Sequence, residues 1–241
     1  TEFNKEDNVY RYAPNEHGQY AETIHDPGGI DTLNFSDYTP SSTIDLREGH
    51  HSSVAGGTNN FNISYGTVIE NLVAGNGHDE ITGNEADNRI IGGRGNDIIA
   101  TKGGDDTAIG NEGHDTYVYE LGNGKLTVNE DRGGGKDTVE MHAFHDNFDS
   151  FKQDLTFRKI NGRDLQISLT MNGKKSQGTV TLKNMNWGGS RVETLKLFDN
   201  EGEQIGQDMS LGSIFLQATN NLQRFERTDF QDQFGYLAIP S

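Results

Sequence analysis

The sequence lacks cysteine, and it is poor in proline, tryptophan, hydrophobic residues and basic residues. Its 241 residues include no cysteine, four prolines and one tryptophan, and only 31% are hydrophobic. Without cysteine the chain can form no disulfide and use no catalytic thiol. No run of 18 or more apolar residues occurs, so we expect no transmembrane segment. Lysine and arginine number 20 against 37 aspartates and glutamates, a net charge of -17. We therefore expect no nucleic-acid partner, because a polyanion would be repelled.

Low hydrophobicity combined with high net charge is also typical of disordered chains. The mean hydropathy is -0.76 and glycine contributes 31 residues, which fits that alternative. The chain starts at Thr1 without a signal-peptide pattern, so we expect it to be part of a longer protein. Any argument for a folded domain has to come from how the glycines and acids are arranged.

The glycines are periodic. Five consecutive nine-residue units run from residue 74 to residue 118. The fourth position of each unit is small, and its residues are Gly77, Ala86, Gly95, Gly104 and Gly113. The sixth position is acidic or amide, and its residues are Asp79, Asn88, Asp97, Asp106 and Asp115. The eighth position is mostly apolar, and its residues are Ile81, Ile90, Ile99, Ala108 and Tyr117. Two outlying units, 26–34 and 132–140, place Asp31 and Asp137 at position six.

These units resemble the calcium-binding nonapeptide of RTX, or haemolysin-type, proteins, which form a parallel β-roll. The segments 23–38, 41–56 and 62–71 resemble the C-terminal domain of serralysin-type metalloproteases, which carries a degenerate calcium turn ahead of the roll. Residues 154–204 are similar to the β-rich region that follows the repeats in RTX toxins and adhesins. The resemblance therefore implies an RTX C-terminal region over most of the chain.

The spacing itself predicts a flattened coil. A six-residue glycine turn and a three-residue strand form half of one coil, so two units close an 18-residue turn. Strands of units n and n+2 then stack in parallel about 4.8 Å apart. Position eight points inward and forms a thin apolar core, while the position-six carboxylates stack along the edges. We expect Asp79, Asp97 and Asp115 on one edge, and Asn88 and Asp106 on the other.

Stacked carboxylates repel one another unless a cation lies between them. Calcium suits this arrangement because it accepts six to eight hard oxygen ligands, backbone carbonyls included, whereas magnesium requires a tighter octahedron. The resemblance implies that each ion is shared by the aspartates of two coils and by carbonyls of the glycine turns. It assigns sites to Asp79 with Asp97 and to Asp97 with Asp115, and a weaker one to Asn88 with Asp106. The further metal-ligating residues that it implies are Gly75, Gly77, Gly93, Gly95, Gly104 and Gly113, Asp137, and Asp26, Gly28, Gly29 and Asp31 for the degenerate site.

Such a segment cannot offset its own loss of conformational entropy. Calcium that binds only the folded state would supply the missing stability. Extracellular calcium modules bind at roughly 10⁻⁴–10⁻³ M, so we expect a loose roll in bacterial cytosol and a folded one outside. Because Asp97 belongs to two implied sites, its loss should weaken calcium binding more than loss of Asp79.

We predict an all-β chain in four parts. Residues 1–73 form an N-terminal β segment with the degenerate calcium turn, and residues 74–140 form the roll. Residues 141–206 form an antiparallel β cap, predicted from alternating apolar residues around Asn161-Gly162 and Asn172-Gly173. Residues 207–241 form a tail with a short helix near residues 214–225. The resemblance implies that type I secretion machinery reads this tail. Trp187 is expected to be a core anchor.

No catalytic motif occurs. The HExxH motif of a metalloprotease is absent, so we expect no catalytic residues, no further cofactor and no enzyme activity from this chain. The pairs His50 with His51 and His142 with His145 are interpreted as surface or turn features rather than zinc ligands.

The sequence therefore predicts a monomeric, secreted calcium-binding module of a large type I-secreted Gram-negative bacterial protein, with an adhesin preferred as the parent. A secreted protease or lipase and a calcium-dependent glycan-binding module remain alternatives. Ice binding is disfavoured because position three carries mixed charges instead of a regular Thr or Asn row.

Overall fold

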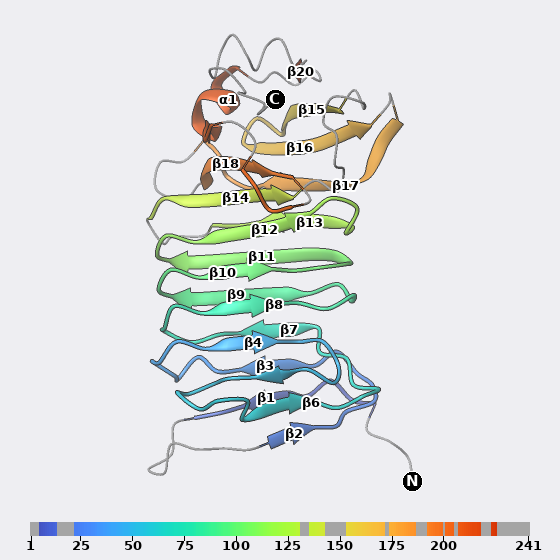
Figure 1. Cartoon of the computed structure of the whole chain (residues 1–241), viewed down its shortest axis with the longest axis vertical. Coiled ribbons are helices and arrows are strands. Elements are labelled where there is room, and N and C mark those ends of the chain that lie inside the picture. Colours follow the sequence, from blue (N-terminus) through green and yellow to red (C-terminus); the bar gives the residue numbers. More distant parts are fainter. Residues whose placement is uncertain are drawn as a thin grey trace.

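The chain forms a stack of flattened β coils along one long axis (Figure 1). The structure is a computed structural model. It describes residues 5–13, 22–130, 135–142, 153–171, 174–186, 192–199, 201–204, 207–217 and 223–225. From β7 to β14 the strands follow chain order along the stack, and β2 and β6 lie together near its N-terminal end.

The described residues form three sheets and one helix, joined by turns. The ten-stranded sheet contains, in spatial order, β1 (Val9–Arg11), β3 (Thr32–Asn34), β7 (Asn71–Val73), β9 (Arg89–Arg94), β11 (Asp105–Glu112), β13 (Lys125–Val128), β17 (Lys174–Leu182), β16 (Asp164–Met171), β15 (Gln153–Ile160) and β20 (Gln223–Phe225). The seven-stranded sheet contains β19 (Met209–Ser210), β18 (Val192–Phe198), β14 (Asp137–His142), β12 (Thr116–Glu120), β10 (Ile98–Ala100), β8 (Glu80–Thr82) and β4 (Thr43–Asp45). The small sheet contains β2 (Glu22–Ile24), β6 (Phe61–Ile63) and β5 (His51–Ser52), and the helix is α1 (Leu211–Gln217).

The strand register confirms the β-roll. Strands β8, β10 and β12 pair in parallel with Ile81 beside Ile99 and Ile99 beside Tyr117. Across the coil, β9 and β11 pair with Ile90 beside Ala108. Each of these partners lies 18 residues further along the chain, so two nine-residue units close one coil as predicted.

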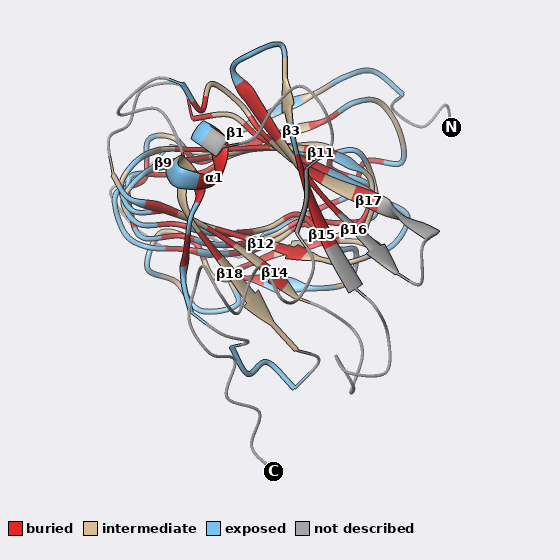
Figure 2. Cartoon of the chain, turned by 90° about the horizontal axis from the view of Figure 1, so that it is seen from above, coloured by how far each residue is buried: buried red, intermediate tan, exposed pale blue. Residues whose placement is uncertain are grey.

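The core lies between the two large sheets, and both sheets contribute buried side chains to it. All five position-eight residues of the repeats are buried, with exposed fractions of 1% or less. Figure 2 looks along the stack and shows buried residues on the strands that face the interior. Strands this short cannot form a broad core, so each coil depends on contacts to its neighbours.

The N-terminal segment continues the roll. Strands β3 and β7 pair in parallel with each other, β7 pairs with β9, and β4 pairs with β8. An aromatic cluster of Tyr12, Phe35 and Phe61 fills this end, with ring centroids 5.2–5.5 Å apart.

The far end is antiparallel, as expected for the cap. Strands β15, β16 and β17 pair antiparallel, and the turn between β15 and β16 uses Asn161 and Gly162 at φ 52° and 70°. The cap is joined to the roll by parallel pairs, β13 with β17 and β14 with β18. Both large sheets therefore run on into the cap.

The tail contains a helix, as predicted, but an earlier and shorter one. Helix α1 ends at Gln217, and β20 lies within the range predicted to be helical because its strand pairs with β15. No helix in the described ranges is long and apolar enough to cross a membrane. Trp187, the Asn172-Gly173 turn and His145 lie outside the described residues, as do residues 218–222 and 226–241 of the tail 207–241 that is expected to carry the secretion signal.

Candidate metal centre

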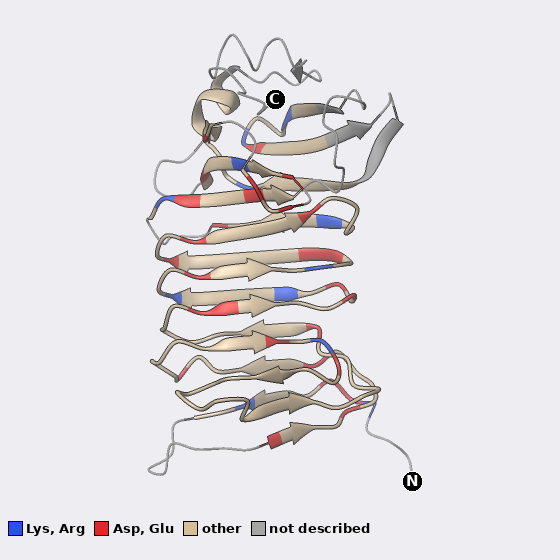
Figure 3. Cartoon of the chain, in the orientation of Figure 1, with Lys and Arg blue, Asp and Glu red and all other residues tan. Residues whose placement is uncertain are grey.

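The turns lie along two edges of the roll. Edge A comprises the turns that lead from the ten-stranded to the seven-stranded sheet, and its described residues are 35–42, 74–79, 95–97, 113–115, 129–130 and 135–137. Edge B comprises the turns that lead into strands of the ten-stranded sheet, residues 25–31, 64–70, 83–88, 101–104 and 121–124. Figure 3 shows acidic residues recurring at both edges along the stack.

Edge A carries a continuous ladder of carboxylates. Each ladder residue directly precedes or begins a strand, and its backbone N–H donates to the carboxylate one coil further on. The N–H of Asp79 donates to Asp97 Oδ1 at 2.8 Å, and the N–H of Asp97 donates to Asp115 Oδ1 at 2.8 Å. The N–H of Asp115 donates to Asp137 Oδ1 at 2.9 Å, and the N–H of Asp137 to Glu193 Oε2 at 2.9 Å. The structure thus brings the expected edge A aspartates together in one row.

Only one oxygen of each central carboxylate is used by this ladder. Asp97 and Asp115 are 0% and 1% exposed, and Oδ2 of each has no hydrogen-bond partner in the described structure. No described Lys or Arg forms an ion pair with either residue. Burial, together with the negative charges of Asp115 and Asp79, raises the pKa of Asp97 to about 7. Buried carboxylates in this state favour either a proton or a metal cation.

Glycine leaves room beside these free oxygens. A Cβ on Gly92 would collide with Asp97 Oδ2, and a Cβ on Gly110 with Asp115 Oδ2. Backbone carbonyls face the same turns, because Gly95 packs against the carbonyl oxygen of Gly77 and Gly113 against that of Gly95. Buried carboxylate and carbonyl oxygens without a competing cation are the donor set that calcium prefers. The residues present therefore fit calcium.

The remaining edge A glycines lie as the repeat predicts. Gly93 stands over the carbonyl oxygen of Gly75, which also accepts the N–H of Arg94 at 3.2 Å. Asp79 differs from the central aspartates because both of its oxygens accept backbone N–H groups, from Ser42 at 2.7 Å and from Gly75 at 3.1 Å. The end of the ladder is therefore better satisfied by protein groups than its middle.

The N-terminal part of edge B has a second cluster of carboxylates. Asp31 Oδ1 accepts the N–H of Asn8 at 2.9 Å, and the N–H of Asp31 donates to Glu70 Oε2 at 2.7 Å. Asp31 is 0% exposed and its Oδ2 has no partner among the described residues. Burial raises the pKa of Asp31, and the nearby Asp26 carboxylate adds to the rise.

Asp26 itself is held by protein donors. Its Oδ1 accepts the N–H of Gly28 at 3.3 Å, and its Oδ2 accepts Tyr10 Oη and the Asn8 amide. Gly29, at φ 117°, packs against the Glu6 carbonyl. The expected degenerate site is thus assembled as a cluster, with Asp31 contributing its unpartnered oxygen.

Further along edge B, amide groups take the place of a carboxylate pair. Asn88 Nδ2 donates to Asn84 Oδ1 at 3.0 Å and to the carbonyls of Ile69 and Glu70 at 3.3 Å. Asn88 Oδ1 accepts the N–H of Asn84 at 2.9 Å. The amide therefore holds together oxygens that an ion would otherwise bridge. Asp106, whose Oδ1 accepts the Asn88 N–H at 2.8 Å, keeps an unpartnered Oδ2 and has its pKa raised by burial to about 7.

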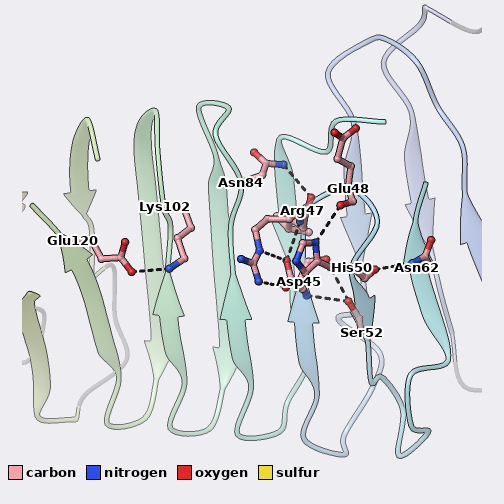
Figure 4. A network of polar contacts seen from close by, with 10 residues as sticks. Asp45, Arg47, Glu48, His50, Ser52, Asn62, Asn84, Lys102 and Glu120 are labelled. Carbon is pink, nitrogen blue, oxygen red and sulfur yellow. Dashed lines mark hydrogen bonds and ion pairs between the residues drawn. The ribbon is translucent and has the colours of Figure 1, made fainter. Parts of the chain in front are cut away.

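Two basic side chains near edge B form ion pairs with acidic side chains. Lys102 stands at the second position of its unit with φ 71°, and its Nζ lies 2.7 Å from Glu120 Oε1. Arg47 pairs with Asp45 at 2.6 Å. Figure 4 shows the two pairs on the same side of the stack, with Asn84 between them. Gly104, the predicted edge B glycine, packs against the Ala86 carbonyl. The two basic side chains neutralise Asp45 and Glu120, whereas Asp106, like Asp97 and Asp115 of edge A, forms no ion pair with a described Lys or Arg.

Sequence reasoning missed acidic residues on both edges. Glu70 occupies position six of the unit 65–73, so extending the nine-residue frame by one unit would have found it. Glu193 joins the ladder only through the cap, and no repeat signal marks it. A shallower rim ladder also occurs at position five, where His78 Nδ1 accepts the N–H of Asn96 at 2.6 Å and His114 Nδ1 that of Lys136 at 2.7 Å. In the described part of the chain, no three His, Asp or Glu side chains alone converge as a metal-holding group. Backbone carbonyls are therefore needed to complete any site.

Comparison with known proteins agrees with this architecture. A family model described as Peptidase M10 serralysin C terminal matches residues 3–190. Serralysin G of Dickeya chrysanthemi is 49% identical over 131 residues, which is 53% of this chain and 28% of that protein. Serralysin of Proteus mirabilis is 44% identical over 66 residues, 27% of this chain and 13% of the relative. Metallopeptidase AprA of Pseudomonas marginalis is 45% identical over 66 residues, 27% of this chain and 14% of the relative.

The chain thus spans less than a third of the length of these relatives. The family match covers the N-terminal coils, the repeats and most of the described cap. Together with the 18-residue coil and its carboxylate ladders, it establishes that the chain belongs to the serralysin C-terminal family, with an RTX-type β-roll.

Proposed function

We propose that this chain is the calcium-binding C-terminal module of a secreted metalloprotease, and that calcium outside the cell completes its fold. The row of buried carboxylates on edge A carries the proposal. Asp97 and Asp115 each keep an oxygen that no described group satisfies, next to glycine turns that leave space for an ion. These residues, with Asp137 and carbonyls of Gly77, Gly95 and Gly113, would hold the calcium. The ion would supply positive charge and oxygen coordination, and the protein would supply the spacing.

The protease parent replaces the adhesin as the preferred reading. The three relatives named above are two serralysins and a metallopeptidase, and nothing in the comparisons favours an adhesin or a glycan-binding protein. Catalysis would belong to a part of the parent protein other than this chain, because the HExxH motif is absent here. We further propose export by type I secretion, with the tail as the signal, and a location outside the cell.

Isothermal titration calorimetry with calcium tests the proposal. We expect several calcium ions per chain at about 10⁻⁴–10⁻³ M and little binding of magnesium. The double substitution of Asp97 and Asp115 by asparagine should remove part of the bound calcium. Replacing Asp87 and Asp105 by asparagine is the matched control, because both aspartates are exposed and lie outside the buried ladders. Wild-type protein without measurable calcium binding would refute the proposal.

A further inference from the structure

An asparagine that precedes a glycine can lose its side-chain amide in a reaction within the chain. The backbone nitrogen of the glycine attacks Cγ of the asparagine, and glycine allows this approach because it has no Cβ and a permissive backbone. The chain contains four such pairs, and three of them lie in the described ranges, namely Asn76-Gly77, Asn123-Gly124 and Asn161-Gly162. The motif is the same in all three, so their surroundings decide which of them can react in the folded chain.

The pair Asn76-Gly77 is held in place in an edge A turn. Asn76 Nδ2 donates to the carbonyls of Ser36 and Tyr38 at 3.2 and 3.3 Å, and its N–H donates to the Tyr38 carbonyl at 2.7 Å. Gly77 is buried, and a Cβ on it would lie 2.5 Å from Ser41. The amide and the glycine nitrogen therefore cannot approach each other without breaking these contacts.

The pair Asn123-Gly124 is held in an edge B turn. Asn123 Nδ2 donates to Glu120 Oε2 at 3.1 Å, and its N–H donates to the Glu120 carbonyl at 3.2 Å. The Gly124 carbonyl accepts Tyr119 Oη at 2.8 Å and the N–H of Thr179 at 3.3 Å. Reorientation of this peptide would break hydrogen bonds on both sides of it.

The pair Asn161-Gly162 lacks such contacts. It lies at the tip of the β15–β16 hairpin, where both residues are exposed. In the described part of the chain, no hydrogen bond reaches the Asn161 side chain, and a Cβ on Gly162 would have no atom within 4 Å. The turn itself is closed by the N–H of Arg163, which donates to the Ile160 carbonyl at 3.1 Å. Exposed loop tips open locally at little cost in free energy, so this pair has the freedom that the reaction needs.

We propose that Asn161 is the site at which the folded chain is chemically modified, by conversion of its amide to aspartate or isoaspartate. The Gly162 nitrogen bonds to Asn161 Cγ, the Cγ–Nδ2 bond breaks, and the side-chain nitrogen leaves as ammonia with the proton that the glycine nitrogen gives up. Water then adds to one of the two carbonyls of the resulting succinimide and breaks its bond to nitrogen. The reaction requires no oxidant, reductant or enzyme, and it places a new negative charge at the tip of the cap hairpin.

Peptide mapping by mass spectrometry of the full chain tests the site. The folded chain is incubated in millimolar calcium at pH 8 in water enriched in oxygen-18, which labels each acid formed during the incubation. We expect Asn161 to be converted at least about tenfold faster than Asn76 and Asn123. The same incubation in concentrated urea is the control, because the three pairs should react at similar rates once the fold no longer restrains them.

The variant Gly162→Ala tests the attacking atom. Its Cβ has open space in the fold but obstructs the approach of the nitrogen to Asn161 Cγ, so conversion of Asn161 should slow while the other two asparagines behave as in wild type. Conversion of Asn76 or Asn123 as fast as that of Asn161 in the folded chain would overturn the inference, and so would an Asn161 that stays unmodified. Equal conversion of Asn161 in Gly162→Ala and wild type would contradict the attack by the Gly162 nitrogen.

Discussion

Replacing Asp97 by asparagine should stabilise the calcium-free roll and destabilise the calcium-loaded one. Asparagine keeps Oδ1, which accepts the Asp79 N–H at 2.8 Å, and replaces the unpartnered Oδ2 by an amide NH₂. Without calcium at pH 8, the substitution removes a buried charge whose pKa has risen from 3.8 to about 7. A rise of roughly three units corresponds to about 4 kcal/mol. Burying the new amide without an acceptor costs about 1–3 kcal/mol, so we expect a net gain of about 1–3 kcal/mol.

With calcium the sign reverses. A bound ion adds about 2.7 kcal/mol when its concentration is about a hundredfold above its dissociation constant. Asp97 lies between Asp79 and Asp115 in the ladder. In about 10 mM calcium, which is about a hundredfold above a dissociation constant of about 10⁻⁴ M, the variant should lose the contribution of one to two ions, about 3–5 kcal/mol, and this loss outweighs the gain without calcium. Urea unfolding in about 10 mM calcium at pH 8 measures the loss, and the far-UV circular dichroism signal in EDTA, which reports the folded fraction, measures the gain.

Asp87→Asn is the matched control for this experiment. Asp87 Oδ1 accepts the N–H of Asp105 at 2.8 Å, the same bond one coil apart, but the side chain is exposed. Its substitution should change stability by less than about 0.5 kcal/mol in either buffer. The reasoning is refuted if Asp97→Asn is less stable than wild type in EDTA, or equally stable in calcium.

Other consequences follow from the buried acids, the glycine turns and the core. Burial raises the pKa of Asp97, Asp106 and Asp137 to about 7. The calcium-free fold therefore binds protons more tightly than the unfolded chain, and its unfolding free energy should fall as pH rises from about 4 to 7. Thermal unfolding in calcium-free buffer at pH 5.5 and 8 measures this change, and higher stability at pH 8 contradicts it. Gly95 has φ 115° and lies against the Gly77 carbonyl, so Gly95→Ala should lower the free energy of unfolding in calcium by about 3 kcal/mol or more. Gly122 has φ 104° but open space around it, so Gly122→Ala should cost only the backbone strain of about 1–2 kcal/mol. Equal losses of stability in urea unfolding would contradict close packing at the Gly95 turn. Ile99→Ala should lower the free energy of unfolding by about 2–5 kcal/mol, and Ile98→Ala, at its exposed neighbour, by under about 1 kcal/mol. Similar melting temperatures for the two variants would contradict the alternation of buried and exposed residues in β10.

The repeating part of the fold could be predicted because one period sets both the coil and the core. Position eight placed Ile81, Ile90 and Ile99 inside, and the 18-residue register followed from two units per coil. The same period placed the edge A aspartates in one row. The helical part of the tail was predicted only roughly, because β20 forms through a contact with β15 that no local pattern records.

The parts of the site that were missed lie where the period changes or the chemistry differs. The coil between β11 and β13 is offset by 20 residues rather than 18, and the next, between β12 and β14, by 22. These irregular coils hide the stacking from a fixed nine-residue frame. The hydrogen bonds of the Asn88 side-chain amide were also missed, because only the folded coil brings Asn84 and the Ile69 and Glu70 carbonyls to that side chain.

Circular dichroism during a calcium titration tests the central claim most directly. The buried carboxylates of edge A predict that the chain gains β structure cooperatively as calcium rises through about 10⁻⁴–10⁻³ M. Equal concentrations of magnesium should produce little change, and EDTA should reverse the gain. A far-UV spectrum and a melting temperature that are the same in EDTA and in millimolar calcium would contradict the claim that calcium completes this fold.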